Sequence, residues 1–344
     1  MTSKLSSDYP WVSTPIIINA PMDGMATEDL AVAVTQAGGI GMLGSALDLD
    51  QLEARLSRTR TLLASPPPPT LLPIGVSMFP FACNPSLALP ILARHPPAIL
   101  WLFCAADPSH YLPWVTGIRQ RSPGTRVWIQ LGSVGAALAA ARLCRPDVLV
   151  LQGADAGGHG FARGASVVSL VPEASDALRA SGFGDVPLVA AGGVADGRGA
   201  AAALALGAAG VVMGTRFLAA RETAVHPRYR GAILAAADGG VSTVRAKVFD
   251  ELRGPTMWPP AYDGRALATD SYKDYVSGVG IERIRELHKE AKEGEGAGFG
   301  EENPRAAVWA GAGVGLVREV KAAAEIVEEV RSAATGILRG LSAL

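Results

Sequence analysis

One histidine lies in a glycine-rich stretch that is typical of a catalytic loop. His159 is preceded by Gly157 and Gly158 and followed by Gly160, shortly after an apolar run that ends at Gln152. Histidine exchanges protons near neutral pH, and glycines let a ligand approach the backbone closely. The other four histidines precede prolines or lie in helical patterns. We therefore predict that His159 is catalytic, and a structural histidine bonded to loop backbone is the alternative.

Two further glycine-rich segments follow apolar runs and could bind a phosphate. Gly192 and Gly193 follow the run that ends at Ala191, and Gly214 and Thr215 follow the run that ends at Met213. Backbone N–H groups at such positions, with one hydroxyl added, are suited to a phosphate. Tight turns between strand and helix are the alternative for either segment taken alone.

Several other kinds of site are excluded by the spacing of residues. No G-x-G-x-x-G follows the first apolar run, which argues against a Rossmann dinucleotide site, and no P-loop lysine is present. The three cysteines form no C-x-x-C pair, and no two histidines have the spacing of a zinc protease. We expect no metal site.

Short apolar runs alternate with longer amphipathic ones along the first two thirds of the chain. Such alternation indicates a parallel sheet that is covered on both faces. Eight units in about 220 residues fit a (β/α)8 TIM barrel, in which the ligand site lies at the carboxyl ends of the strands. A doubly wound open sheet is the alternative. The predicted strands are Pro15–Ala20, Ile40–Gly44, Leu72–Ser77, Ile99–Phe103, Val127–Leu131, Val148–Gln152, Val186–Ala191 and Gly210–Met213.

The remaining third of the sequence predicts a C-terminal extension made of loops and a helix. The stretch Pro227–Asp238 is predicted to be the last barrel helix, and Val314–Ala334 an amphipathic helix that packs back on the barrel. We divide the chain into a barrel with its docked helix, residues 1–236 and 305–344, and an inserted segment, residues 237–304. The inserted segment is expected near the barrel mouth.

The composition limits the kinds of partner that the protein is expected to bind. The net charge of −1 gives no electrostatic reason to bind nucleic acid or an anionic membrane surface. No apolar segment is long enough for a membrane span, and the first residues lack a signal-peptide pattern. We expect a cytoplasmic enzyme with a small-molecule substrate, and leave a homodimer open.

Taken together, these segments resemble the nitronate monooxygenases, also called 2-nitropropane dioxygenases. The resemblance runs through six stretches: PIIINAPMDG, AVTQAGGIGMLG, QGADAGGHG, VAAGGVADGRG, GVVMGTRFL and VWAGAGVGLV. It implies a TIM barrel with FMN as cofactor and His159 as the catalytic residue. It also implies flavin contacts by Ala20, Pro21, Met22, Ser77, Gln130, Gln152, Gly157, Gly192, Gly193, Met213, Gly214 and Thr215. Ser77 replaces the asparagine of many relatives.

The resemblance implies oxidation of alkyl nitronates, and of nitroalkanes, with dioxygen to a carbonyl compound and nitrite. His159 would remove the α-proton of a neutral nitro compound or hold the nitronate oxygens. Two alternatives remain: an NAD(P)H-dependent FMN reductase of the enoyl-carrier-protein or quinone type, and a flavin-binding protein without catalysis. The fold by itself does not separate them.

Overall fold

Eight parallel strands form a barrel at the centre of the computed structural model, which describes residues 4–44, 48–66, 70–300 and 302–342. Neighbouring strands follow the order β1-β9-β8-β6-β5-β4-β3-β2, and a bridge between Ile18 and Ile40 joins the two ends of this order. The TIM barrel predicted from the sequence is therefore confirmed, and all eight predicted strands are present. They are β1 Ile17–Asn19, β2 Met42–Leu43, β3 Leu72–Met78, β4 Pro97–Phe103, β5 Arg126–Leu131, β6 Val148–Gln152, β8 Leu188–Ala191 and β9 Gly210–Met213.

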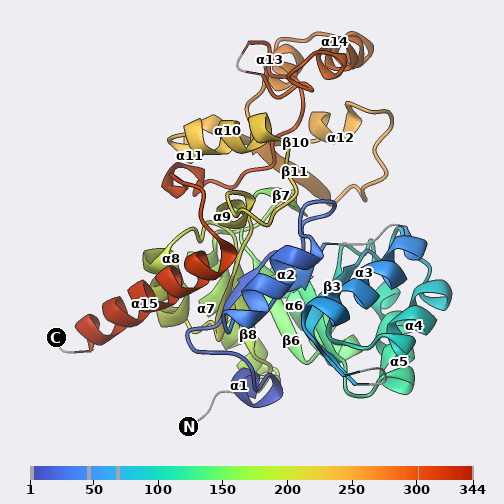
Figure 1. Cartoon of the computed structure of the whole chain (residues 1–344), viewed down its shortest axis with the longest axis vertical. Helices are drawn as coiled ribbons and strands as arrows, with labels where there is room; N and C mark the ends of the chain where they lie inside the picture. The colour runs from blue at the N-terminus through green and yellow to red at the C-terminus, as the bar shows by residue number, and fades with distance from the viewer. Residues whose placement is uncertain (1–3, 45–47, 67–69, 301, 343–344) are drawn as a thin grey trace.

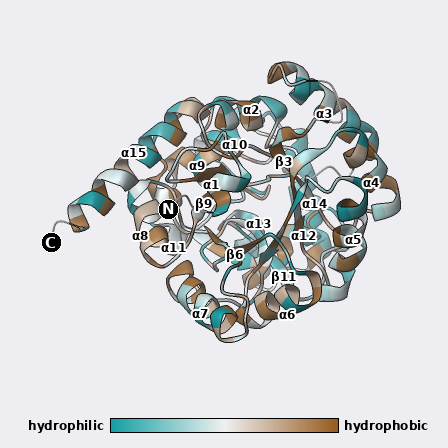
Figure 2. Ribbon diagram, turned by 90° about the horizontal axis from the view of Figure 1, so that it is seen from below, coloured by the Kyte–Doolittle hydropathy of each residue, from teal (hydrophilic) through white to brown (hydrophobic). Residues whose placement is uncertain are grey.

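A ring of helices covers the outside of the barrel, as Figure 2 shows from below. Because one face of the strands meets the helices and the other fills the interior, their residues are apolar almost without interruption, and every residue of β4 is buried. Side chains such as Thr27 and Asp196 accept hydrogen bonds from the first N–H groups of their helices, which fixes where the helices begin. The helices that follow barrel strands β1 to β6 and β8 are α2 Glu28–Gln36, α3 Leu49–Leu62, α4 Pro85–Arg94, α5 Leu112–Arg121, α6 Val134–Cys144, α7 Val167–Ala180 and α8 Gly197–Ala205.

The eighth position of this ring is filled by the last helix of the chain. Helix α15, Ala323–Leu341, packs against α8 and α2 (Figure 1). The prediction that residues 227–238 form the last barrel helix is wrong, because α10, Pro227–Ala235, packs against the short helix α9, Thr215–Leu218, and the 3-10 turn Val314–Leu316. The amphipathic helix predicted to begin at Val314 begins nine residues later, at Ala323. It does not begin earlier because Lys321 is held in an extended conformation by backbone hydrogen bonds to Ala219 and Arg221.

A second layer, which we call the cap, lies over the carboxyl ends of the barrel strands (Figure 1). Its sheet has the order β10-β11-β7, with β7 Gly158–Phe161, β10 Thr243–Ala246 and β11 Tyr262–Leu267. Its other elements are α10, α11 Gly239–Ser242, α12 Val248–Glu251, α13 Asp270–Val276 and α14 Ile281–Glu293. Strand β7 follows β6 directly in the chain, so one strand of the cap sheet comes from the connection between two barrel strands. The division at residues 237 and 304 stays a prediction.

The opposite end of the barrel is closed by the N-terminal segment. Helix α1, Lys4–Asp8, buries Leu5, and the phenol oxygen of the buried Tyr9 accepts a hydrogen bond of 2.8 Å from Nε1 of Trp128. Burial raises the pKa of Tyr9 well above its usual value. The ligand site therefore has to open toward the cap.

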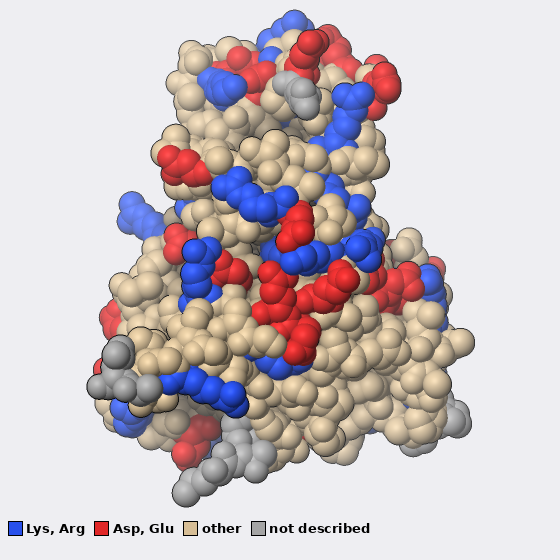
Figure 3. Space-filling model, turned by 60° about the vertical axis from the view of Figure 1, so that its left-hand side comes forward, with Lys and Arg blue, Asp and Glu red and all other residues tan. Residues whose placement is uncertain are grey.

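Charged side chains of both signs gather on the surface where the barrel meets the cap, while large parts of the barrel flank carry few of them (Figure 3). The mixture agrees with the net charge of −1. Among the described residues, no helix is both long and apolar enough to cross a membrane.

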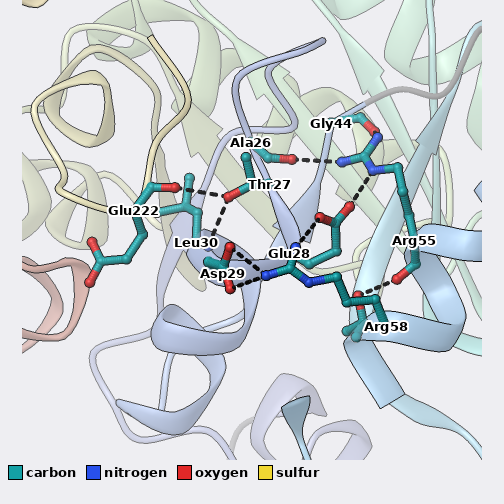
Figure 4. A network of polar contacts seen from close by, with 10 residues as sticks. Ala26, Thr27, Glu28, Asp29, Leu30, Gly44, Arg55, Arg58 and Glu222 are labelled. Atoms are coloured by element: carbon teal, nitrogen blue, oxygen red, sulfur yellow. Dashed lines mark hydrogen bonds and ion pairs between the residues drawn. The ribbon is translucent and has the colours of Figure 1, made fainter. Parts of the chain in front are cut away.

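A polar network fixes the loop that follows β1 (Figure 4). Arg55 of α3 donates to the carbonyls of Ala26 at 2.9 Å and Gly44 at 3.2 Å, and pairs with Glu28. Arg58, one turn further on, binds Asp29 at the surface. The network ties α2 to α3 beneath the loop that carries Pro21 and Met22, and so supports one edge of the cavity described next.

Candidate active site

A cavity of about 650 Å³ lies between the carboxyl ends of the barrel strands and the cap. This is the place where ligand sites occur in TIM barrels, and the volume is typical of a cofactor pocket. Every predicted site residue except Met213 lines it: Ala20, Pro21, Met22, Ser77, Gln130, Gln152, Gly157, His159, Gly192, Gly193, Gly214 and Thr215. The side chain of Met213 instead packs in the core outside the cavity, and its carbonyl accepts a hydrogen bond from the N–H of Ala20.

His159 is the most closely constrained polar side chain of this cavity. Its Nε2 lies 2.5 Å from Oδ1 of Asp250. Its ring stacks on Trp258 with centroids 3.6 Å apart and planes 11° from parallel, and Trp309 lies 4.8 Å away on centroids. The imidazole therefore has one fixed orientation, set by a carboxylate and two indoles.

The position of His159 comes from strand pairing. The glycine-rich stretch forms strand β7, and His159 lies opposite Gly264 of the antiparallel strand β11. A Cβ at Gly264 would come within 2.3 Å of the Trp309 ring, so only glycine lets that indole lie across the strand. His159, which the sequence places in a glycine-rich loop, thus lies on a short strand of the cap.

The turns after β8 and β9 bring bare backbone to the other part of the cavity. Gly192 and Gly193 have φ values of 106° and 76°, which side chains rarely adopt. A Cβ on Gly192 would lie 2.9 Å from the carbonyl oxygen of Gly153. The turn after β8 therefore requires glycine. We call the surface formed by Gly192, Gly193, Gly214 and Thr215 the cradle.

A segment near the C-terminus completes the cradle, and sequence analysis assigned it no role in the site. The hydroxyl of Thr215 accepts a 3.0 Å hydrogen bond from the N–H of Gly311, and the N–H of Ala312 donates to the carbonyl of Asp155. A Cβ at Gly311 would meet that same carbonyl at 2.6 Å. The available signal was the alternation of glycines at 311, 313 and 315, which repeats the composition of the other ligand-side turns.

Two glutamines and a serine lie deeper in the cavity. Gln152 donates from Nε2 to the carbonyl of His159 at 3.0 Å, while its Oε1 is buried without a hydrogen-bond partner. Gln130 accepts from Nε1 of Trp101 at 3.0 Å. Ser77 is fully buried on β3. The unpartnered amide oxygen is a polar group for which the described protein atoms provide no donor.

Aromatic side chains form the wall nearest to His159. Phe79, Phe81, Phe103 and Trp258 contact one another with ring centroids 5.0–6.5 Å apart. All four line the cavity. This wall offers an apolar surface beside the imidazole.

Charges around the cavity are few. Among the described residues that line it, Arg253 has the one cationic Lys or Arg side chain. Burial, helped by Arg253 and Lys292, lowers the pKa of His288 to about 4, so this second histidine is neutral at pH 7. Burial raises the pKa of Asp23, against the opposing charge of Arg55. The site thus combines one imidazole–carboxylate pair with a largely uncharged lining.

Comparison with known families identifies the chain. The family model described as nitronate monooxygenase matches residues 115–332. The chain belongs to the nitronate monooxygenase family. It is 46% identical over 347 residues to nitronate monooxygenase npaC of Metarhizium robertsii, covering 98% of this chain and 96% of the relative. It is 40% identical to nitronate monooxygenase of Neurospora crassa, covering 99% and 94%. This is a family of flavin-dependent oxidoreductases, as the resemblance had implied.

Solved structures agree on the fold. FabK of Thermotoga maritima superposes with a TM-score of 0.77 at 24% identity, covering 100% of this chain and 99% of that one. Nitroalkane oxidase of Streptomyces ansochromogenes superposes with a TM-score of 0.74 at 23% identity, covering 98% and 100%. Both cover the cap as well as the barrel, so the two-layer arrangement is shared.

Asp250 and Trp309 are the residues beside His159 that sequence analysis missed. Asp250 lies in the ordinary amphipathic stretch KVFDEL, and Trp309 precedes the late glycines. Asp250 has no motif around it, and Trp309 belongs to the stretch VWAGAGVGLV, to which sequence analysis assigned no site residue. Their places beside His159 depend on the pairing of β7 with β11 and on the elements beside these strands.

Proposed function

We propose that this protein oxidises alkyl nitronates with dioxygen, giving a carbonyl compound and nitrite, with FMN as its cofactor. The observation that carries the proposal is the shared cavity, in which a glycine cradle and a fixed imidazole face one space. The family membership and the names of the two fungal relatives agree with it.

The residues present fit FMN. A phosphate needs several N–H donors at close range, and the glycine turn at Gly192 and Gly193 lines the cavity with backbone that carries no side chain. The buried, unpartnered Oε1 of Gln152 suits a polar group of the flavin ring. We assign the phosphate to Gly192, Gly193, Gly214, Thr215 and the Gly311 segment. The ring is assigned to the segment Ala20–Met22, Ser77, Gln130, Gln152 and Gly157.

Bound FMN would supply the electron acceptance and the reaction with dioxygen. The protein's own part is to place the substrate and to manage one proton. The aromatic wall would receive the alkyl group and exclude water, while His159 holds the nitro or nitronate oxygens. With a neutral nitroalkane, the imidazole would take the α-proton and leave the electron pair on the nitro group.

The test is anaerobic reduction of the flavin in purified, FMN-loaded protein. Ethyl nitronate goes into one cuvette and NADH or NADPH into another. We expect rapid bleaching by nitronate and release of nitrite when air is admitted. Bleaching by the nicotinamide with nitronate inert would overturn the proposal and favour the reductase alternative. Failure of the protein to take up FMN would overturn the cofactor assignment.

A cytoplasmic location and a homodimer stay predictions. Sedimentation of the flavin-loaded protein would decide the oligomeric state.

A further inference from the structure

The carboxylate of Asp250 has an unusual set of neighbours for a buried acid. Its side chain is 3% exposed. Oδ1 contacts Nε2 of His159 at 2.5 Å, and Oδ2 is buried with no hydrogen-bond partner among the described residues. An acid retained to stabilise the fold would normally satisfy both oxygens with N–H groups or an arginine. The polar contact of this side chain is therefore directed to the histidine.

The contact determines which ring nitrogen of His159 holds the proton. A carboxylate only accepts hydrogen bonds, so neutral His159 must hold its proton on Nε2, the atom that faces Asp250. The other nitrogen, Nδ1, then has a free lone pair. No hydrogen bond among the described residues uses Nδ1, and His159 lines the cavity.

The two indoles prevent the ring from escaping this arrangement. A rotation about the Cβ–Cγ bond would take Nε2 away from Asp250 only if the ring plane left the face of Trp258, whose ring centroid lies 3.6 Å away with the planes 11° from parallel. Trp309 closes the other approach at 4.8 Å. Ring plane and proton position are thus fixed by different residues.

We propose that Asp250 is the positioning residue of the reaction: it holds the proton of His159 on Nε2 and so presents Nδ1 to the substrate as the base. The inference rests on the proposed function for its chemistry, although its structural part does not. In the step it serves, the α-C–H bond of a nitroalkane breaks, the proton goes to Nδ1, and the electron pair stays on the nitro group as nitronate. The imidazolium that results keeps its Nε2–H on Asp250, which stabilises the new charge.

The experiment compares the native protein with Asp250→Asn, both full-length and flavin-loaded. The Nδ2 amide of asparagine can donate to Nε2, which would move the proton of His159 to Nδ1. We expect long-range ¹H–¹⁵N correlation NMR to show an Nε2–H tautomer in the native protein and an Nδ1–H tautomer in the variant. The His159→Asn spectrum assigns the signals. Glu251→Gln, on the same helix, is the matched control that should leave the tautomer unchanged.

The kinetic counterpart uses two substrates. For Asp250→Asn we expect kcat/KM with nitroethane to fall about 100-fold or more, because the base is lost. With preformed ethyl nitronate, which needs no proton abstraction, we expect less than about a tenfold fall, since the Nδ1–H of the variant can donate to the nitronate oxygens. Flavin content and Tm identify a variant that fails to fold, and Asp250→Glu, which keeps the charge, should recover part of the nitroethane activity.

Each outcome decides a separate point. A native Nδ1–H tautomer, or one that Asp250→Asn leaves unchanged, overturns the positioning role whether or not nitronates are oxidised. Equal losses on both substrates, or a native enzyme that is inert to nitroethane, overturn the proton-abstraction step. A native protein that shows the expected tautomer and oxidises no nitronate would overturn the proposed function alone.

Discussion

The cradle and the His159 cluster lie in the same cavity and are built in opposite ways. The cradle uses backbone from the turns that directly follow β8 and β9, and the positive φ values of Gly192 and Gly193 disfavour side chains in the first of these turns. The His159 cluster uses side chains of Asp250, Trp258 and Trp309, which reach the histidine across the cap sheet. The proposed cofactor site is thus built mainly from the barrel's own connections, with the Gly311 segment added, whereas the proposed chemistry depends on contacts between distant parts of the chain.

This contrast predicts that the two functions can be lost separately. The largest expected effect is that of His159→Asn, which removes the base and the charge. We expect turnover of nitronates and nitroalkanes to fall about 10²- to 10⁴-fold, with the flavin still bound, because the cradle is untouched. Steady-state nitrite release and the flavin absorbance spectrum measure the two quantities. Intact activity would show that His159 is not catalytic, and loss of flavin would show that the regions are not separable.

The reverse separation is expected from Gly192→Ala. The new Cβ lies 2.9 Å from the Gly153 carbonyl at a φ of 106°, so the turn must shift. Strain of this kind costs about 1–3 kcal/mol, which corresponds to a roughly 5- to 150-fold weaker affinity for FMN if the cofactor needs the native turn. Fluorescence titration of FMN into the apoprotein measures it.

The matched control for that experiment is Gly135→Ala, at a surface position of α6 where a Cβ meets nothing within 4 Å. It should leave the affinity unchanged. Unchanged affinity in Gly192→Ala as well would remove the cradle from the cofactor site.

His288 is a buried histidine of the cap helix α14 that also lines the cavity. Its folded pKa of about 4 lies below the value of 6.5 that it has when exposed. Between pH 6.5 and 4 the unfolded chain therefore binds a proton that the folded chain does not, so this residue lowers stability as the pH falls. We expect the free energy of unfolding, measured with urea at pH 7 and pH 4.5, to fall by about 2 kcal/mol less in His288→Gln than in the native protein. Equal losses would mean that His288 is hydrated in the folded protein.

The smallest effects are expected under the barrel's first loop, where two neighbouring arginines make different contacts. Arg55→Ala removes bonds to two loop carbonyls and to the buried Glu28, and should lower the free energy of unfolding by about 2 kcal/mol. Arg58→Ala removes an exposed pair with Asp29 and should cost at most about 0.5 kcal/mol. Urea denaturation of both variants checks this ranking, and a larger loss for Arg58→Ala would contradict it.

Sequence reasoning succeeded where the signal was local. Each barrel strand is a short buried run followed by a turn, so the eight strands and the glycines after them could be found without knowing any long-range contact. Sequence reasoning failed where long-range contacts decide which segment occupies a position in the fold. The helix Pro227–Ala235 follows β9, but α15 covers the position that it was expected to fill, and nothing near residue 227 indicates this. Asp250 lies 91 residues from His159 and has no motif of its own.

That last barrel position has a consequence for how the protein is made. Residues 214–322 separate β9 from α15, so a ribosome must complete the cap before it releases the helix that covers α2 and α8. The faces that α15 buries, through Ile326, Val327 and Val330, stay uncovered until residues 323–341 have been synthesised. A chain stopped at residue 322 would therefore contain every strand of the barrel and every site residue, and still leave the first and seventh helices without the neighbour that joins them.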